Sequence, residues 1–248
     1  MKKLFLFLFP LLLISCSSNK YVWINYSVNN VPIPAKMEPI PISVNFHILT
    51  DNRDNVEDNK ILFASSHMVA IDGKGFCVNS EQYYRKDSVV TQISRLFVKH
   101  ANKVKLFSQT SLNEDIGNGY YLTGTLNSFY GKQEYPTATN TITTTDNNAT
   151  NVAVAGALLG GVIGGLMESS AYSINTPGTI IIEMSNLKLF KNNGILVKDF
   201  GDFFQEYKGY FRVDGNCGCI YENVNVMLKD FHAKLIEKIR EELAGEEF

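Results

Sequence analysis

The chain has 248 residues, of which 45% are apolar and 19% are charged. This composition supports one sizeable hydrophobic core and excludes a chain that is disordered throughout. The formal net charge is −2, so no basic surplus attracts nucleic acid, and we expect no nucleic-acid partner. Four cysteines are too few for a small disulfide-stabilised scaffold.

Residues 1–15 have the pattern of a secretory signal peptide. Lys2 and Lys3 form a positive start, and an apolar run follows from Leu4 to Ile14. As a helix, this run covers only about half of a ~30 Å hydrocarbon layer. It is therefore too short to remain as a transmembrane helix.

The sequence Leu13-Ile14-Ser15-Cys16 resembles the lipobox of bacterial lipoproteins. The resemblance implies cleavage before Cys16, diacylation of its thiol and a third acyl chain on the new amino group. Two or three acyl chains make attachment to membrane lipid effectively permanent. The alternative is an ordinary signal peptide in which Cys16 occurs by chance.

The residues after Cys16 indicate which membrane the protein reaches. Ser17 and Ser18 stand where many lipoproteins carry the aspartate that retains them in the inner membrane. By the same resemblance, we expect a lipid anchor in the outer membrane, with the protein facing the periplasm.

Residues 16–40 predict an extended, lipidated tether, because three prolines and many Asn and Ser residues exclude a long helix. Its aromatic residues are Tyr21, Trp23 and Tyr26. They suit either the lipid headgroup level or packing onto the domain, and packing is the preferred interpretation.

Residues 41–248 predict a single domain that begins with strands. Residues 42–49 alternate apolar and polar side chains, which indicates a half-buried strand with Ile42, Val44, Phe46 and Ile48 on one face. Residues 67–71 and 76–78 flank turn formers and predict a short hairpin. Asp87-Ser88 can cap a helix whose apolar face runs from Val89 to Ala101.

The second half of the domain predicts more strands and a long helix. Residues 104–107 and 120–130 suit strands, and residues 179–190 and 195–211 form a hairpin with a type I′ turn at Asn193-Gly194. A helix over residues 221–244 carries one apolar stripe. The stripe consists of Val224, Leu228, Phe231, Leu235, Ile239 and Leu243.

This order of elements predicts an α+β fold, with two helices packed on one face of a mainly antiparallel sheet. The lipobox, the alternating strand leading into Asp51-Asn52-Arg53, the middle helix and the long last helix resemble the YajG-like and ABC-transport auxiliary families of periplasmic lipoprotein domains. The resemblance covers roughly residues 40–131 and 179–245. It implies a small domain of the cell envelope.

Residues 132–178 interrupt that resemblance as an insertion. A polar run to residue 151 predicts a loop, and residues 152–167 carry no charge. The five glycines that form or flank a ridge at a spacing of four are Gly156, Gly160, Gly161, Gly164 and Gly165. Such a glycine zipper favours membrane contact or self-association. A flexible apolar loop, or a β-hairpin like that of the curli secretion lipoprotein family, are the alternatives.

The same insertion contains Asp146-Asn147-Asn148-Ala149-Thr150, which resembles the sequon of some bacterial oligosaccharyltransferases. The resemblance implies Asn148 as the acceptor. An unmodified loop is the preferred interpretation.

After lipidation of Cys16, three thiols remain in an oxidising compartment, which predicts one disulfide and one odd cysteine. Cys77 can pair with either Cys217 or Cys219, and the sequence leaves this choice open. The histidines are scattered at positions 47, 67, 100 and 232, so we expect no metal site and no cofactor. We expect His232 to be a partly covered surface residue.

No GxSxG, HExxH, Walker A or GxGxxG pattern occurs in the sequence, and Asp51, Arg53 and Asp54 suit a turn with a local ion pair. We therefore expect a protein that is not an enzyme. The hypothesis is a lipid-anchored binding or assembly accessory that meets other envelope proteins. The alternative is a subunit of a homo-oligomeric or pore-forming assembly that associates through the insertion.

Overall fold

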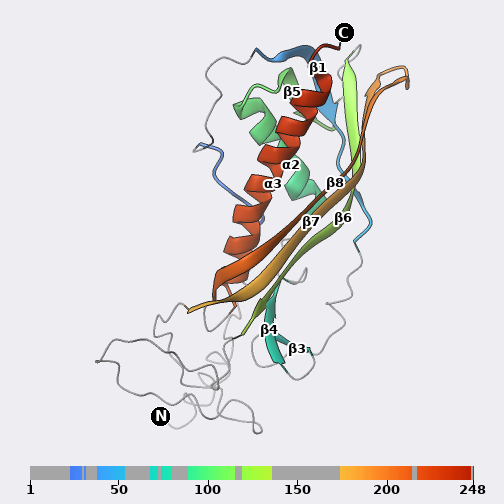
Figure 1. The fold of residues 1–248 in the computed structure, drawn as a ribbon. Coiled ribbons are helices and arrows are strands. Elements are labelled where there is room, and N and C mark those ends of the chain that lie inside the picture. The colour runs from blue at the N-terminus through green and yellow to red at the C-terminus, as the bar shows by residue number, and fades with distance from the viewer. Residues whose placement is uncertain are drawn as a thin grey trace, which may run out of the picture.

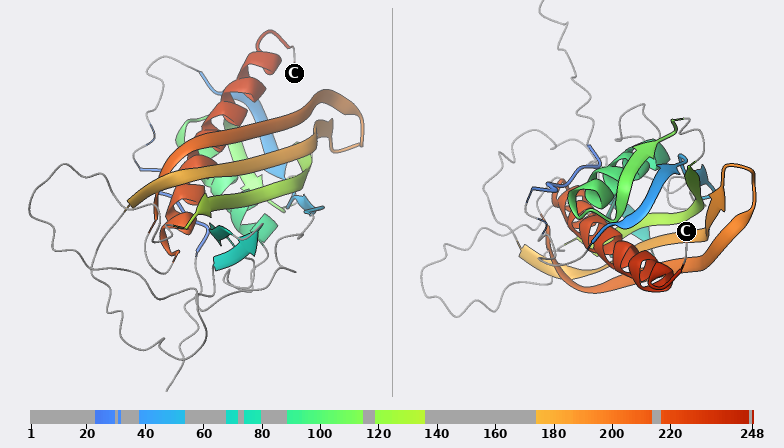
Figure 2. Two further views of the ribbon diagram at one scale, coloured as in Figure 1. Left: turned by 60° about the horizontal axis from the view of Figure 1, so that its bottom comes forward. Right: turned by 90° about the horizontal axis from the view of Figure 1, so that it is seen from above.

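The computed structural model describes residues 23–29, 31, 38–53, 68–71, 74–79, 89–114, 119–135, 174–213, 217–246 and 248. These residues form an α+β fold in which two helices lie against one face of a curved sheet (Figures 1 and 2). The predicted signal peptide, Cys16, the helix cap at residues 87–88, Asn148 and the glycine-rich run lie outside the described residues.

The elements follow the predicted order of strands, helix, strands and helix. They are β1 (Ile40–Phe46), β2 (Thr50–Asp51), β3 (Met68–Ile71), β4 (Lys74–Val78), α2 (Val89–Lys103), β5 (Phe107–Leu112), β6 (Tyr120–Glu134), β7 (Ile174–Lys191), β8 (Leu196–Val213) and α3 (Cys219–Leu243).

Strand β6 is the centre of a mixed, eight-stranded sheet. Along one side, β6 pairs with β7 in an antiparallel ladder, and β7 pairs in the same way with β8. The other partners of β6 are β1 and β2, which are parallel to it, and β4, which is antiparallel. The longest ladders are thus antiparallel, as expected, whereas the central β1 is parallel to both β5 and β6.

The first strand is shorter than its alternating pattern predicts. Strand β1 ends at Phe46, and Ile48 is 36% exposed instead of pointing into the core. The chain instead buries Leu49, whose backbone N–H donates to the Ser94 hydroxyl of α2 at 3.2 Å. Contact with the helix therefore overrides the period-two pattern after Phe46.

The prediction of a strand over residues 104–107 is wrong for residues 104–106, which follow Lys103 at the end of α2 and cap that helix. Lys105 has a φ of 53°, the Lys105 N–H donates to the Asn102 carbonyl, and the Leu106 N–H donates to the Ala101 carbonyl. This is a Schellman motif, which satisfies the last helical carbonyls. The sequence did not predict this motif, because lysine rather than glycine occupies the left-handed position. Strand β5 begins only at Phe107.

The long hairpin is present, but its turn is not type I′. A type I′ turn needs a positive φ at both central residues, here Asn193 and Gly194. Only Gly194 has one, at 82°. The Gly194 N–H donates to the Lys191 carbonyl, and the Lys191 N–H donates to the Ile195 carbonyl. This is a three-residue loop with a glycine bulge. Both ends of the predicted insertion also belong to strands, since β6 continues to Glu134 and β7 begins at Ile174.

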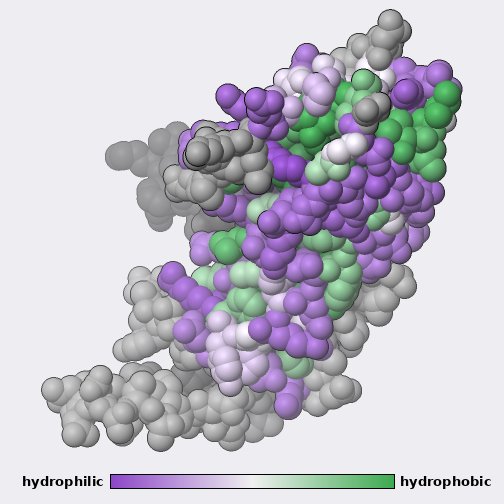
Figure 3. Space-filling model, turned by 45° about the horizontal axis from the view of Figure 1, so that its top comes forward, coloured by the Kyte–Doolittle hydropathy of each residue, from purple (hydrophilic) through white to green (hydrophobic). Residues whose placement is uncertain are grey.

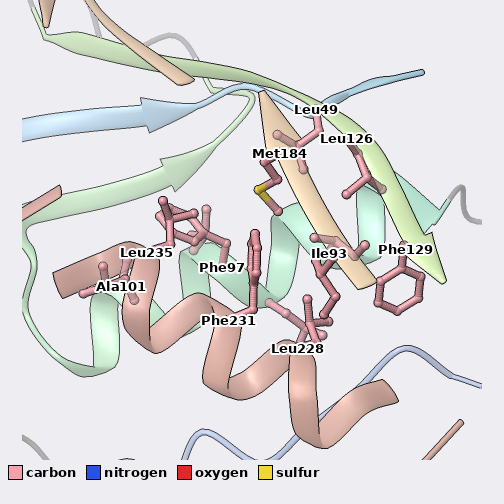
Figure 4. Packing of buried hydrophobic residues seen from close by; sticks show 14 of the residues in the cluster. Leu49, Ile93, Phe97, Ala101, Leu126, Phe129, Met184, Leu228, Phe231 and Leu235 are labelled. Atoms are coloured by element: carbon pink, nitrogen blue, oxygen red, sulfur yellow. The ribbon is translucent and has the colours of Figure 1, made fainter. Parts of the chain in front are cut away.

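The core lies between the sheet and the two helices. Figure 4 shows side chains of α2 and α3 pointing toward those of β6 and β7. The predicted apolar stripe of α3 is confirmed, because all six of its residues are at most 2% exposed. Strand β6 approaches α3 so closely at Gly131 that an added Cβ would lie 2.5 Å from a methyl group of Val224. Gly131 is thus required for the packing of sheet and helix.

A disulfide joins the short hairpin to the start of the last helix. Cys77 of β4 bonds to Cys217, with their Cα atoms 5.3 Å apart, and Cys219 is buried and takes no part in this disulfide. Cys217 adopts a φ of 57° immediately before α3. The bond connects residues that are 140 positions apart in the sequence.

Removal of this bond with Cys77→Ser and Cys217→Ser should lower the free energy of unfolding by about 4 kcal/mol, because the closed loop is long. Chemical denaturation of oxidised protein measures the loss. The matched control is Cys219→Ser, which keeps the bond. A peptide map that links Cys77 to Cys219 would contradict the pairing.

Candidate functional site

Part of the predicted tether lies on the helix layer of the domain. We call residues 23–28 the strap. Ile24 is 3% exposed, and the partly buried Tyr26 and Val28 pack against the same core. Trp23, in contrast, is 49% exposed. The preferred interpretation of the aromatic residues, packing onto the domain, therefore holds for Tyr26 and not for most of the Trp23 surface, and Tyr21 lies outside the described residues.

Amide side chains of both helices hold the backbone of the strap. The Ile24 N–H donates to Oε1 of Gln92 on α2 at 3.1 Å. Asn225 of α3 accepts from the Asn25 N–H and donates to the Trp23 carbonyl, each at 3.1 Å. Asn225 thereby pairs with the strap much as a neighbouring strand would. The strap is bound to α2 and α3 at the same time.

Tyr26 completes this attachment through a buried polar cluster. Its hydroxyl lies 3.1 Å from Nδ1 of His100 on α2 and 2.6 Å from Nδ1 of His232 on α3. His100 is 1% exposed and His232 is 0% exposed. We call Tyr26, His100 and His232 the clasp, because they join the strap to both helices.

The number of protons in the clasp dictates its hydrogen-bond directions. One phenolic proton cannot serve two imidazole Nδ1 atoms, so one imidazole must donate. In the described structure, His232 Nε2 is buried without a hydrogen-bond partner. An unprotonated Nε2 costs less free energy there than a buried Nε2–H donor without an acceptor. We therefore assign His232 Nδ1–H as donor to the Tyr26 oxygen, and the Tyr26 hydroxyl as donor to His100 Nδ1 at 3.1 Å rather than to the more distant Leu96 carbonyl at 3.4 Å.

Burial keeps all three groups of the clasp uncharged. Desolvation lowers the pKa of His100 to about 4, with a smaller contribution from the charge of Lys229. Desolvation, and then the neighbouring His100, lowers the pKa of His232 well below 6.5. Burial also raises the pKa of the Tyr26 phenol above its usual range. A second proton on either ring would therefore destabilise the attachment of the strap.

The geometry of the clasp suits attachment better than chemistry on a substrate. The Phe97 and His232 rings pack in a T-shaped arrangement at a centroid distance of 5.5 Å, and both side chains are fully buried. In the described structure His100 and His232 are at most 1% exposed, so a solute would have to displace packed side chains to reach their rings. Within the described ranges, no group of three or more His, Cys, Asp or Glu residues is placed to hold a metal ion.

The sequence did not predict the clasp, and the expectation of a partly covered surface residue is wrong for His232, which is fully buried. The burial of His232 could have been predicted, because Leu228, His232 and Ile236 recur at a spacing of four on the buried face of α3. The pairing of His232 with Tyr26 had no such signal, since the two residues are 206 positions apart.

The other predicted site residues are dispersed. Cys77 and Cys217 come together, whereas Asp51 and Arg53 form the expected local ion pair at 2.6 Å, in which the Arg53 side chain is 8% exposed and the Asp51 side chain 40%. Asp54 lies outside the described residues. Cys16 and the five glycines of the insertion lie outside the described residues. In the described part of the chain, neither helix is long and apolar enough to cross a membrane.

Exposed apolar side chains occur at two places on the hairpin of β7 and β8. Figure 3 shows apolar surface at the end where the hairpin turns, where Ile195 and Leu196 are 57% and 49% exposed. Farther along β8, Phe204 and Tyr210 are 51% and 76% exposed. These residues are candidates for contact with another molecule.

No protein-family model matches the sequence, and no curated protein matches it significantly. Among solved structures, the chain is similar to protein XCC0632 from Xanthomonas campestris, described as DUF330. The TM-score is 0.46 at 8% identity, over 86% of this chain and 93% of that one. A neuraminyllactose-binding hemagglutinin homolog from Helicobacter pylori gives a TM-score of 0.36 at 14% identity, over 90% and 94% of the chains. Both are bacterial proteins, and scores this low carry no argument about function.

Replacement of Tyr26 by Phe should lower the free energy of unfolding by about 1–3 kcal/mol, because it leaves buried imidazole nitrogens without a partner. Denaturant titration measures the change. Tyr210→Phe is the matched control, since that hydroxyl belongs to a side chain that is 76% exposed, and it should alter stability by less than about 0.5 kcal/mol. Equal effects of the two substitutions would contradict the clasp.

The free energy of unfolding should fall as the pH falls from about 6.5 toward 4. In this range the two histidines bind protons in the unfolded chain but stay neutral in the folded clasp. Each histidine contributes a slope of up to about 1.4 kcal/mol per pH unit in this window. In His100→Gln, the free energy of unfolding should vary less steeply with pH. Chemical denaturation at several pH values measures this, and an unchanged slope would contradict the assignment.

Proposed function

We propose that the protein is a lipid-anchored, non-catalytic accessory of the bacterial cell envelope that holds its domain close to a membrane and contributes to binding or assembly there. The leader over residues 1–15 and the lipobox at Leu13-Ile14-Ser15-Cys16 support the anchor. The observation that carries the proposal is the strap, because it ties the chain just after the anchor to both helices of the domain.

The short distance along the chain from Cys16 to the strap limits how far the domain can move from the lipid. Fully extended residues span at most about 3.6 Å each, so Cys16 and Trp23 can be at most about 25 Å apart. Release of the strap would let the domain move farther away. An acylated Cys16 would thus hold the helix layer nearer to the membrane than a free tether over residues 16–40 allows.

The proposed location is the periplasmic face of the outer membrane, since Ser17 and Ser18 follow Cys16. The proposed partners are membrane lipid, through acylated Cys16, and other envelope proteins, with no cofactor involved. A role without catalysis agrees with the clasp, whose ionisable groups are enclosed and uncharged. A homo-oligomer formed through the insertion remains the alternative, on the spacing of Gly156, Gly160 and Gly164.

Metabolic labelling with an alkyne analogue of palmitate tests the anchor. The full chain should be labelled and sediment with membranes, whereas Cys16→Ser should lose the label, because the thiol that accepts lipid is gone. Cys219→Ser is the matched control and should be labelled like the unmodified chain. Loss of the label together with continued membrane binding would assign membrane binding to the insertion. Labelling of Cys16→Ser would contradict the proposal.

A further inference from the structure

Strand β8 presents a long free edge. Within the described part of the chain, β8 pairs only with β7. The carbonyls of Asp202 and Arg212 accept hydrogen bonds from the α3 side chains Lys238 and Asn223, so they do not point toward β7. Because backbone direction alternates along a strand, the N–H and C=O groups of Glu206, Lys208 and Tyr210 also point outward. An unpaired edge of this kind is a template for another strand.

The side chains of this edge divide between two faces. The odd-numbered residues turn toward α3: Phe203 packs against Phe231 at a ring-centroid distance of 4.9 Å, and the Tyr207 hydroxyl donates to Asp230 at 2.9 Å. The even-numbered residues form the exposed face. They are Asp202, Phe204, Glu206, Lys208, Tyr210 and Arg212.

This exposed face is complementary to itself when reversed about Tyr207. In an antiparallel pair of two β8 strands centred on Tyr207, Glu206 faces Lys208, Phe204 faces Tyr210 and Asp202 faces Arg212. Opposite charges and aromatic rings are the cross-strand pairs that stabilise sheets. The twofold symmetry makes each of these pairs twice.

Other alignments of two β8 strands lose this complementarity. A centre at residue 206 places two Glu206 side chains opposite each other, and a centre at residue 208 does the same for Lys208. A centre at Gln205 pairs Lys208 with Asp202, but it places Phe204 opposite Glu206 and Tyr210 opposite Phe200, which is buried and not on the exposed face. A centre at Gly209 pairs Glu206 with Arg212, but it places Tyr210 opposite Lys208. Like charges directly opposite destabilise a strand pair. Among centres from 205 to 209, only Tyr207 pairs both the charges and the rings.

We propose that the protein forms a twofold-symmetric dimer in which two β8 strands pair antiparallel about Tyr207, so that the two sheets become one continuous sheet. The occupant of the free edge is therefore a second copy of this chain. Lys238 and Asn223 bind edge carbonyls at both ends, so backbone pairing is confined to residues 204–210, and Asp202 and Arg212 face each other through their side chains alone. Within that range, the Gln205 side chain must release the Phe204 carbonyl, to which it donates at 2.9 Å. Isologous pairing of this kind closes the assembly at two copies.

The geometry of the dimer is compatible with attachment to one bilayer. A twofold axis perpendicular to the sheet keeps both helix layers on the same side, and the strap lies on the helix layer (Figure 2). Both straps would then face one membrane. The dimer itself does not require the anchor, because residues 204–210 are remote in sequence from Cys16.

Charge reversal on the exposed face tests the dimer. In sedimentation of the full chain in detergent, Glu206→Lys should weaken dimerisation about tenfold or more, because two ion pairs become repulsive. Glu206→Lys combined with Lys208→Glu should restore the dimer, since reversal of both charges keeps each pair complementary. Far-ultraviolet circular dichroism during heating confirms that each variant folds. Equal dissociation constants for the single and double variants would overturn the proposal.

Cysteine crosslinking in intact cells tests the register. Facing residues of a hydrogen-bonded pair have Cα atoms about 5.5 Å apart, which suits a disulfide. Glu206→Cys and Lys208→Cys, co-expressed as two differently tagged chains in a Cys219→Ser background, should crosslink on mild oxidation. Glu206→Cys with Tyr210→Cys is the mismatched control and should crosslink much less. Equal crosslinking of both combinations, or crosslinks only to another protein, would overturn the dimer.

Discussion

The contact between α3 and the hairpin of β7 and β8 determines how the rest of the molecule is arranged. The apolar stripe of α3 is buried on this sheet, and Gly131 lets β6 approach the helix where a larger residue would not fit. A sheet that is covered on one face buries about one side chain in two along each strand, because successive side chains point to opposite faces. The contact therefore leaves the alternate residues of β8 on the outer face, and it leaves the edge of β8 without a neighbour among the described residues.

The opposite surface of the helix layer receives the strap. Two sets of hydrogen bonds hold the strap: amide side chains of the helices bind its backbone, and His100 and His232 bind the Tyr26 hydroxyl. The clasp is stable only while its imidazoles are neutral, because no described carboxylate lies within salt-bridge distance of them. A segment that would otherwise be a free tether thus becomes part of the domain.

The strap and the free edge of β8 give the proposed anchored accessory two separate functions. The strap limits the distance between the domain and a lipid attached at Cys16, and the edge offers pairing to a second copy. They lie on different elements and have different physical bases, burial of neutral polar groups for the one and alternating charged and aromatic residues for the other. Each can therefore be disrupted without direct change to the other.

The sequence by itself determined the order of the elements, the α+β class and the buried stripe of α3, because these depend on local periodicity. It did not determine the end of α2, where a left-handed lysine replaces the expected glycine, or the turn at residues 192–194. Only the tertiary structure decided that Cys77 pairs with Cys217 and that Tyr26 meets His100 and His232. The physical reason is that these contacts join residues 70 or more positions apart, and no local pattern encodes the distance between them.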